Sequence, residues 1–318
     1  NGYDGQFYHY QAHDPFLRKG FSKYMDDPRL RYRRLLVPAA AYLLAGGQDR
    51  FVDAAYFGVI LFSVFLGAWW LSRYASGTGR HPAWGLAFLL VPATLVSIDR
   101  LTIDVTLAAL TMGFALFARQ EPGWKLWLLL CCASLTRETG ILLPAGYCLS
   151  LLWQRRVLRT IMFAAAGRPA MAWFAFLQPR TPADLLTLTY DAGVPSRIRL
   201  WLLSTAKYDL PGGLAWAMTV LDYLVALAIL VAVVLAIRYA WKRFPTAEGF
   251  AGLLFGLLTM VIAVVLTQGD PYTYPRLASP LLALVALQGL SRKEWVGLLP
   301  GALVAARVAA QLGPQVLG

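Results

Sequence analysis

Side chains that can do chemistry are concentrated at the very start of the chain, which holds Asp4, Tyr8, His9, His13 and Asp14. A carboxylate such as Asp4 in a polar segment can act as a general base that removes a proton from a hydroxyl group. His9 and His13 are four residues apart, so a helix would place both rings on one face. Zinc usually takes three or four protein ligands, and neither nearby acid has a metal-ligand spacing to them. We therefore predict no metal site here.

Arginines and carboxylates recur at the edges of later apolar runs. These residues are Arg31 and Arg34, then Asp99, Arg100 and Asp104, then Arg137 and Glu138, and finally Tyr274 and Arg276. Guanidinium groups bind phosphate bidentately and keep their charge. Ionisable groups at membrane depth usually face a polar cavity or each other. We therefore expect these side chains and the opening segment to line one cavity, in which Arg31, Arg34 and Arg276 hold a phosphate group.

Simpler interpretations stay open for several of these residues. Asp99 with Arg100, and Arg137 with Glu138, are equally well explained as ion pairs that fix helix ends. Asp104 can cap the helix that follows it. At least two of the four arginines in residues 29–34 are expected to lie at lipid headgroups.

The composition is that of a membrane protein. The 318 residues are 58% hydrophobic and 14% charged, whereas soluble domains carry about 25% charged residues. The net charge of +12 would suggest nucleic-acid binding in a soluble protein, but here Lys and Arg in cytoplasmic loops explain it. We expect no nucleic-acid partner. Cys131, Cys132 and Cys148 lie in apolar runs and form neither a disulfide framework nor a zinc spacing.

The apolar runs predict an all-α fold, a polytopic membrane helical bundle with about nine to ten spans plus an interfacial helix. Residues 1–34 are expected to form the first loop and residues 35–318 the transmembrane domain, with a second loop at 178–213. The short, proline-containing run Leu35–Gly46 is expected to be half-inserted. The expected spans are Phe51–Leu71, Trp84–Ile98, Ile103–Ala118, Leu126–Leu135, Ile141–Trp153, Thr160–Leu177, Leu214–Ile237, Phe250–Thr267, Leu281–Leu290 and Trp295–Leu312.

The distribution of basic residues predicts the orientation. If residues 1–34 lie outside, the basic clusters of the alternate loops fall on the cytoplasmic side, as the positive-inside rule requires. Arg168 interrupts the run Thr160–Leu177, and the orientation downstream would invert if that run did not cross. The charge pattern after it favours crossing. We therefore expect both loops, and the candidate site, on the extracytoplasmic face.

Three motifs carry a resemblance to a known family: Gly2–Tyr8 (GYDGQFY) with Asp14-Pro15, Arg31–Pro38 (RYRRLLVP) and Leu135–Gly140 (LTRETG). Together they resemble bacterial multi-pass members of the GT-C glycosyltransferase superfamily. The resemblance implies a first extracytoplasmic loop with an acidic catalytic residue, here Asp4, and a polyprenyl-phosphate sugar as donor. It also implies a transmembrane helix ahead of that loop, which this sequence does not contain, and whether a native helix precedes Asn1 stays open.

The chain departs from the family at one point that matters for chemistry. The family often shows a paired acidic motif in the first loop, whereas Asp4 has no adjacent acid and Asp14 is the next candidate. Both the exact base and a requirement for a divalent cation, Mg²⁺ or Mn²⁺, therefore stay open.

The preferred hypothesis is an inverting transfer of a sugar from a polyprenyl-phosphate donor to an extracytoplasmic acceptor, in a bacterial inner membrane. Asp4 is the expected base, and the expected pocket residues are Tyr8, His9, Asp14, Arg31, Arg34, Asp99, Arg100, Asp104, Arg137, Glu138, Tyr274 and Arg276. The second hypothesis is a non-catalytic subunit of a larger membrane complex, with protein partners. A transporter ranks third, because the sequence shows no matching halves of the kind that many transporters have.

Overall fold

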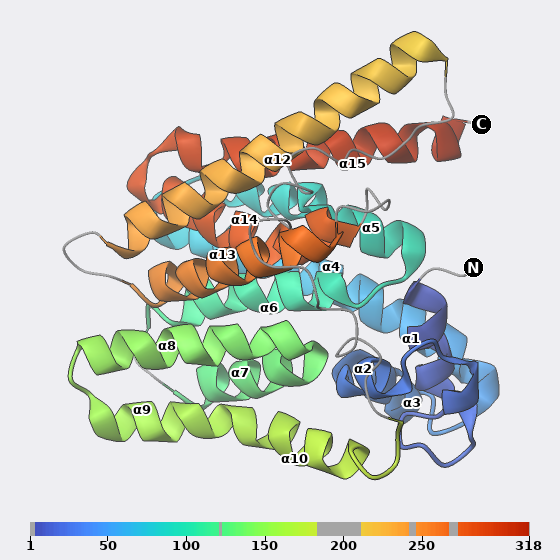
Figure 1. Ribbon diagram of the computed structural model, residues 1–318. Coiled ribbons are helices and arrows are strands. Elements are labelled where there is room, and N and C mark those ends of the chain that lie inside the picture. Colours follow the sequence, from blue (N-terminus) through green and yellow to red (C-terminus); the bar gives the residue numbers. More distant parts are fainter. Residues whose placement is uncertain (1–3, 121–122, 183–210, 242–245, 267–272, 318) are drawn as a thin grey trace.

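The computed structural model describes residues 4–120, 123–182, 211–241, 246–266 and 273–317, which form helices and turns without any β-strand. Most of the helices run alongside one another as a bundle, and α1, α2 and α3 gather at one end of it (Figure 1). The all-α expectation is therefore confirmed for the described part of the chain.

The opening segment is itself largely helical. Asp14 organises its turn, because the buried carboxylate accepts backbone N–H groups from Arg18 at 2.6 Å and Lys19 at 2.8 Å. Asp27 caps the second helix by accepting the N–H of Leu30, with Pro28 in the first turn. The elements are α1 (Asp4–His13), η1 (Phe21–Tyr24), α2 (Pro28–Arg33) and α3 (Leu36–Leu44).

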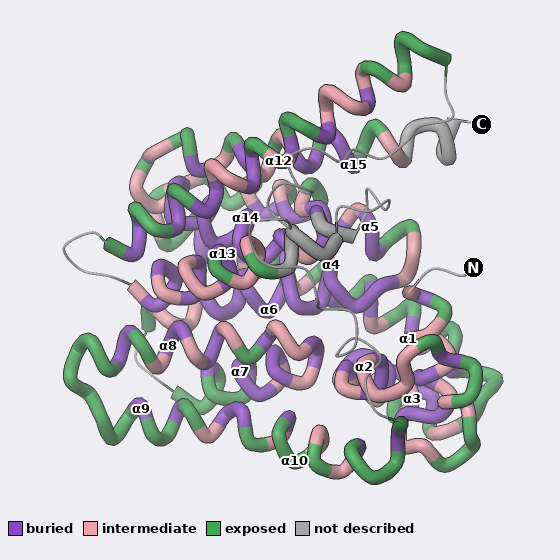
Figure 2. Tube along the Cα trace, viewed as in Figure 1, coloured by how far each residue is buried: buried purple, intermediate pink, exposed green. Residues whose placement is uncertain are grey.

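The middle of the chain builds the centre of the bundle. Its elements are α4 (Asp49–Gly77), η2 (Pro82–Leu90), α5 (Pro92–Arg100), α6 (Asp104–Phe117), α7 (Trp124–Thr136), η3 (Glu138–Ile141) and α8 (Leu142–Trp153). Helix α6 is buried along most of its length (Figure 2). The expected span Trp84–Ile98 is a bent pair, because Val91 is extended before Pro92 and η2 meets α5 at 58°.

The second half of the chain contributes one long helix of 29 residues, α12, and several shorter ones. Its elements are α9 (Val157–Ala164), η4 (Ala165–Gly167), α10 (Arg168–Leu177), α12 (Gly212–Ala240), α13 (Ala247–Leu266), α14 (Thr273–Arg292), η6 (Trp295–Gly297) and α15 (Leu299–Leu317). The expected interruption at Arg168 is mild, because Pro169 lies in the first turn of α10, where proline is tolerated. The run Val157–Leu177 continues as one 21-residue helical segment.

Three helical segments of the described chain are long and apolar enough to cross a membrane, namely α4, the run Val157–Leu177 and α12, and the bent pair of η2 and α5 adds a fourth if it is one span. Large apolar side chains such as Phe62, Phe65 and Trp69 on α4 are exposed on the outside of the bundle. A soluble protein rarely exposes such a surface, whereas a membrane covers it. The structure is thus a helical bundle with candidate membrane spans, and the larger number of spans stays a prediction because helices such as α6 and α7 are shorter.

Candidate functional site

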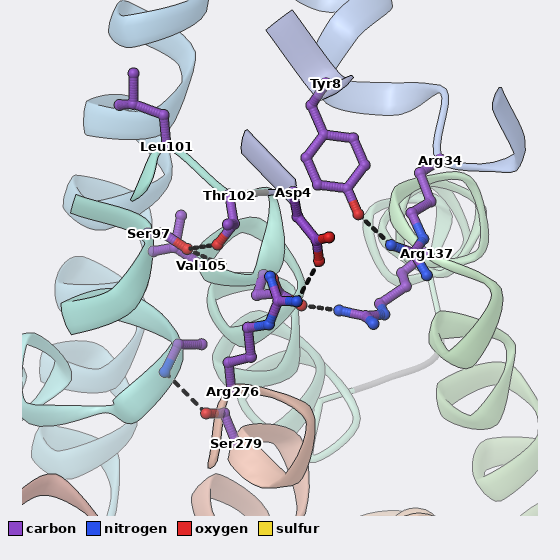
Figure 3. A network of polar contacts seen from close by, with 12 residues as sticks. Asp4, Tyr8, Arg34, Ser97, Leu101, Thr102, Val105, Arg137, Arg276 and Ser279 are labelled. Carbon is purple, nitrogen blue, oxygen red and sulfur yellow. Dashed lines mark hydrogen bonds and ion pairs between the residues drawn. The ribbon is translucent and has the colours of Figure 1, made fainter. Parts of the chain in front are cut away.

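Asp4, the first residue of α1, lies between two arginines from distant parts of the chain. Its Oδ1 pairs with Nη2 of Arg31 at 2.9 Å, and its Oδ2 accepts a hydrogen bond from Arg276. Figure 3 shows the Asp4 carboxylate directed at the Arg276 guanidinium. The Asp4 side chain keeps 21% of its surface exposed, whereas Arg276 keeps 4%. Asp4 is thus the accessible edge of a buried charge pair.

Asp104 extends this pair inward. One of its oxygens accepts a hydrogen bond from Arg137, and the other lies 3.3 Å from Nη1 of Arg276. All three side chains are almost fully buried. Ile103 occupies the N-cap position of α6 and makes no capping hydrogen bond with its side chain, while Ser97 Oγ accepts the N–H of Val105 in the first turn. The helix-cap interpretation of Asp104 is therefore not what the structure shows, since its carboxylate serves two arginines.

Glu138 and Tyr8 close the network. Glu138 accepts two hydrogen bonds from Arg34, at 2.9 and 2.6 Å, and lies 3.7 Å from Nε of Arg137. The Tyr8 hydroxyl accepts hydrogen bonds from Arg34 and, at 3.5 Å, from Arg31. A closed circuit results, which we call the arginine–carboxylate ring. In order its members are Asp4, Arg276, Asp104, Arg137, Glu138, Arg34, Tyr8 and Arg31.

Most ring residues lie at helix ends or in the short link after α2. Figure 3 shows several of them with the helices that carry them. Two glycines allow these ends to meet. A Cβ atom on Gly5 would lie 1.8 Å from the carbonyl oxygen of Arg100, at the end of α5. A Cβ atom on Gly140 would lie 1.9 Å from the carbonyl oxygen of Ala133 in α7. Both contacts require glycine, so the backbone next to Asp4 and next to Glu138 is fixed by close packing.

The ring holds four guanidinium groups against three carboxylates, and Asp26 adds a fourth carboxylate from its outer side, 2.7 Å from Arg31. Burial alone would raise the pKa of Asp4, but the charges of Arg276 and Arg31 outweigh it and hold that pKa well below its ordinary value. Burial would likewise raise the pKa of Glu138, but Arg34 and then Arg137 lower it to about 2. Asp4 is consequently a weak base as long as both arginines hold it.

The ring does not fit a divalent cation such as Mg²⁺ or Mn²⁺. Those ions require several oxygen ligands, but both oxygens of Asp4 and both oxygens of Asp104 already serve guanidinium groups. The four positive charges around them also oppose a second cation.

Other expected site residues lie elsewhere. Asp14 holds the turn described above, and Asp99 forms an ion pair with Arg100 at 2.7 Å, in which both side chains are about one-third exposed. His9 contacts Asp53 on the surface between α1 and α4. The side chain of Tyr274 and most of the expected second loop, residues 183–210, lie outside the described residues.

Sequence reasoning missed three groups of charged residues. Asp26 escaped notice because nothing in its surroundings distinguishes it from a solvated loop carboxylate. Asp49 and Asp53 lie at the head of a long apolar run and are four residues apart, which was the available signal. Asp222 on α12 and Arg307 on α15 form a buried ion pair at 2.7 Å. Their signal was a lone charge inside each apolar run, the type of residue that is costly in a membrane.

Comparisons with protein-family models, with curated protein sequences and with solved structures find no match to this chain.

Proposed function

We propose that this protein is a GT-C-type glycosyltransferase that moves a sugar from a polyprenyl-phosphate donor to an extracytoplasmic acceptor, in a bacterial inner membrane. One observation carries the proposal. A partly exposed carboxylate, Asp4, occupies the space between Arg31 and Arg276, which is the position that a phosphate group with two bidentate partners would take.

Exchange of these partners links donor binding to catalysis. A donor phosphate displaces the Asp4 carboxylate from Arg31 and Arg276. Once released, Asp4 loses the two positive charges that depress its pKa, so its basicity rises when the donor is in place. The free carboxylate then accepts the proton of the acceptor hydroxyl. The hydroxyl oxygen bonds to the anomeric carbon while the bond from that carbon to the phosphate oxygen breaks, and the two arginines stabilise the departing polyprenyl phosphate.

An apolar cavity beside α14 suits the lipid part of the donor. Residues seven, eleven and fourteen positions after Arg276, which are Ala283, Leu287 and Leu290, share its face of the helix at 3.6 residues per turn. These three residues line an apolar cavity of about 270 Å³ together with side chains from η2, α5 and α15. A helix rise of 1.5 Å per residue puts Ala283 about 10 Å beyond Arg276. The arrangement suits a phosphate head at the ring and a prenyl tail along the bundle.

The test is transfer activity of the purified full chain in proteoliposomes, assayed with a panel of polyprenyl-phosphate sugars carrying a radioactive sugar. Asp4→Asn should abolish transfer, because it removes the base. Asp26→Asn is the matched control, because Asp26 also pairs with Arg31 but lies outside the ring, and it should keep most of the activity. Full transfer by Asp4→Asn, in a preparation in which the unsubstituted chain is active, would overturn the assignment.

A second candidate, a non-catalytic subunit of a membrane complex, is favoured by one observation, namely that every carboxylate of the ring already has an arginine partner. Such a ring can hold helix ends together without taking part in any reaction. This candidate predicts that the protein purifies from native membranes with stoichiometric partners and that Asp4→Asn leaves the complex intact. It also predicts no transfer with any lipid-linked sugar.

A further inference from the structure

A cluster of histidines and aspartates lies on the surface between α1 and α4, apart from the ring. His9 and His13 are one turn apart on α1, and Asp49 and Asp53 are one turn apart at the start of α4. Nε2 of His9 lies 2.6 Å from Oδ1 of Asp53, and Nε2 of His13 lies 3.1 Å from the same oxygen. Three donor atoms from two helices thus converge on one point.

A second carboxylate fixes the orientation of one imidazole. Nδ1 of His13 lies 3.0 Å from Oδ1 of Asp49, so this carboxylate is placed to accept a hydrogen bond from a proton on Nδ1. In that tautomer the lone pair of the other nitrogen, Nε2, is available to bind an ion beside Asp53. A histidine that donates through one ring nitrogen to a carboxylate and binds through the other is a recurring arrangement in zinc sites.

The convergence requires either a proton on each of the two nitrogens or a cation shared by all three donor atoms. Two imidazole nitrogens face one carboxylate oxygen, and lone pairs repel unless a proton or a cation lies between them. Donor atoms of His9, His13 and Asp53 lie within 4.8 Å of one another, a spacing that small movements of exposed side chains convert to the ~2 Å bonds of a zinc ion. Lys19 lies 2.7 Å from Asp49, so it offsets the carboxylate that orients His13 and leaves the charge of Asp53 for the ion.

We propose that His9, His13 and Asp53 form a site for a divalent transition metal of the zinc class, with Asp49 as the positioning residue that orients His13. Imidazole nitrogens favour such metals over Mg²⁺ or Ca²⁺. With three protein ligands and an exposed setting, the ion keeps at least one position for water. The site joins α1 to α4, so the ion fixes the helix that carries Asp4 and Tyr8. The inference does not depend on the proposed glycosyl transfer.

The experiment is a titration of the purified, metal-free full chain with Zn²⁺, followed by competition with a chromophoric chelator. The unsubstituted chain should bind one Zn²⁺ at this site. His9→Ala and His13→Ala should each weaken that binding by at least about tenfold, since each removes a ligand. Asp49→Asn should weaken it by about 10–100-fold, the usual effect of losing an orienting carboxylate. The matched control is His81→Ala, because His81 lies at the start of η2 outside the cluster. The Zn²⁺ affinity of this variant should equal that of the unsubstituted chain.

Two further readouts distinguish this site from a cysteine site and from a simple ion pair. Thiolate ligands give Co²⁺ an intense charge-transfer absorption, so its absence would exclude the cysteines as the binding groups. Zn²⁺ should raise the Tm of the unsubstituted chain and of His81→Ala by equal amounts, and it should raise the Tm of His13→Ala less at the same Zn²⁺ concentration, because the stabilisation falls as the affinity falls. Equal Zn²⁺ affinity of the unsubstituted chain, His9→Ala and His13→Ala would overturn the proposal, as would the absence of saturable binding. A histidinium paired with Asp53 would then account for the cluster.

Discussion

Helix α1 takes part in two charged clusters of opposite character. Toward the bundle it contributes Asp4 and Tyr8 to the arginine–carboxylate ring, where Arg34, Asp104 and other members are almost fully buried. Toward the surface it contributes His9 and His13 to the cluster with α4, where the Asp53 side chain is 70% exposed. The α1 members of both clusters lie within the ten residues of that helix, yet one set is surrounded by protein and the other faces the surface.

The difference between the clusters lies in what each charge gains from its partner. A buried charge without a partner is strongly destabilising, so the ring members depend on each other. An exposed ion pair contributes between nothing and about 1 kcal/mol, so stability alone does not account for the convergence of His9, His13 and Asp53. In the function that we propose, the ring serves both structure and ligand exchange, whereas binding of an ion accounts better for the surface cluster.

The strongest test of the comparison is removal of the charge at the centre of the ring. Asp104→Asn leaves Arg137 and Arg276 without their shared carboxylate, and it should destabilise the protein by about 3–5 kcal/mol. Asp99→Asn is the matched control, because Asp99 pairs with Arg100 while about one-third exposed, and it should cost less than about 1 kcal/mol. Thermal unfolding in detergent measures both. Equal losses for the two variants would show that burial does not distinguish the ring.

The second test moves the helix rather than the charge. Gly5→Ala would place a Cβ atom 1.8 Å from the carbonyl oxygen of Arg100, so α1 must shift and take Asp4 with it. The expected cost is about 1–3 kcal/mol, the usual penalty for overpacking. Gly58→Ala on α4 is the control, since its Cβ would meet nothing within 4 Å, and alanine there should be neutral or slightly stabilising. A Gly5→Ala variant as stable as the unsubstituted chain would contradict the tight approach of α1 to α5.

Much of the fold follows from the sequence, because long apolar runs have few alternatives to helices. The run expected at Ile103–Ala118 is α6, Asp104–Phe117, and the run expected at Ile141–Trp153 ends where α8 ends. The helices within residues 1–34 were not anticipated in detail. Helix α1, with the sequence DGQFYHYQAH, mixes polar and aromatic residues around its circumference, so it lacks the periodic apolar pattern that identifies a helix.

Eight of the thirteen residues expected in one pocket form the ring, but the sequence neither separated them from His9, Asp14, Asp99 and Arg100 nor revealed their pairing. All members of the ring were expected to share one cavity, and the structure brings them into contact, although their roles stay predictions. The pairing of Asp4 with Arg276 joins residues 272 positions apart, which no local pattern encodes. Asp14 has the same chemistry as Asp4, but its carboxylate accepts hydrogen bonds from backbone N–H groups in the turn at residues 14–21. Composition alone does not predict these hydrogen bonds.

A third test uses pH to measure how much a buried ion pair of the ring contributes to stability. Because the pKa of Glu138 is lowered from 4.5 in the unfolded chain to about 2 in the fold, its pairing with Arg34 stabilises the protein above pH 4.5. That contribution is lost as the pH falls from 4.5 toward 2. The decrease in Tm over this window should be smaller for Glu138→Gln than for the unsubstituted chain. Parallel Tm curves for the two proteins would contradict the depressed pKa.

The smallest effect is expected at the surface cluster in the absence of metal. Asp53→Asn should change the stability of the metal-free protein by less than about 1 kcal/mol, because its carboxylate is exposed. The same variant should lose the stabilisation by Zn²⁺. A large loss of stability without metal would instead make Asp53 a structural residue, and the contrast with the ring would disappear.

The proposed function requires the ring to open at Asp4 and bind a lipid phosphate. The most direct measurement is a density map of the purified full chain, determined with and without undecaprenyl phosphate. We expect the phosphate between Arg31 and Arg276, the Asp4 carboxylate displaced from both, and the prenyl chain along Ala283 and Leu287. A map in which Asp4 keeps both ion pairs while the lipid lies elsewhere would contradict the account and favour a purely structural ring.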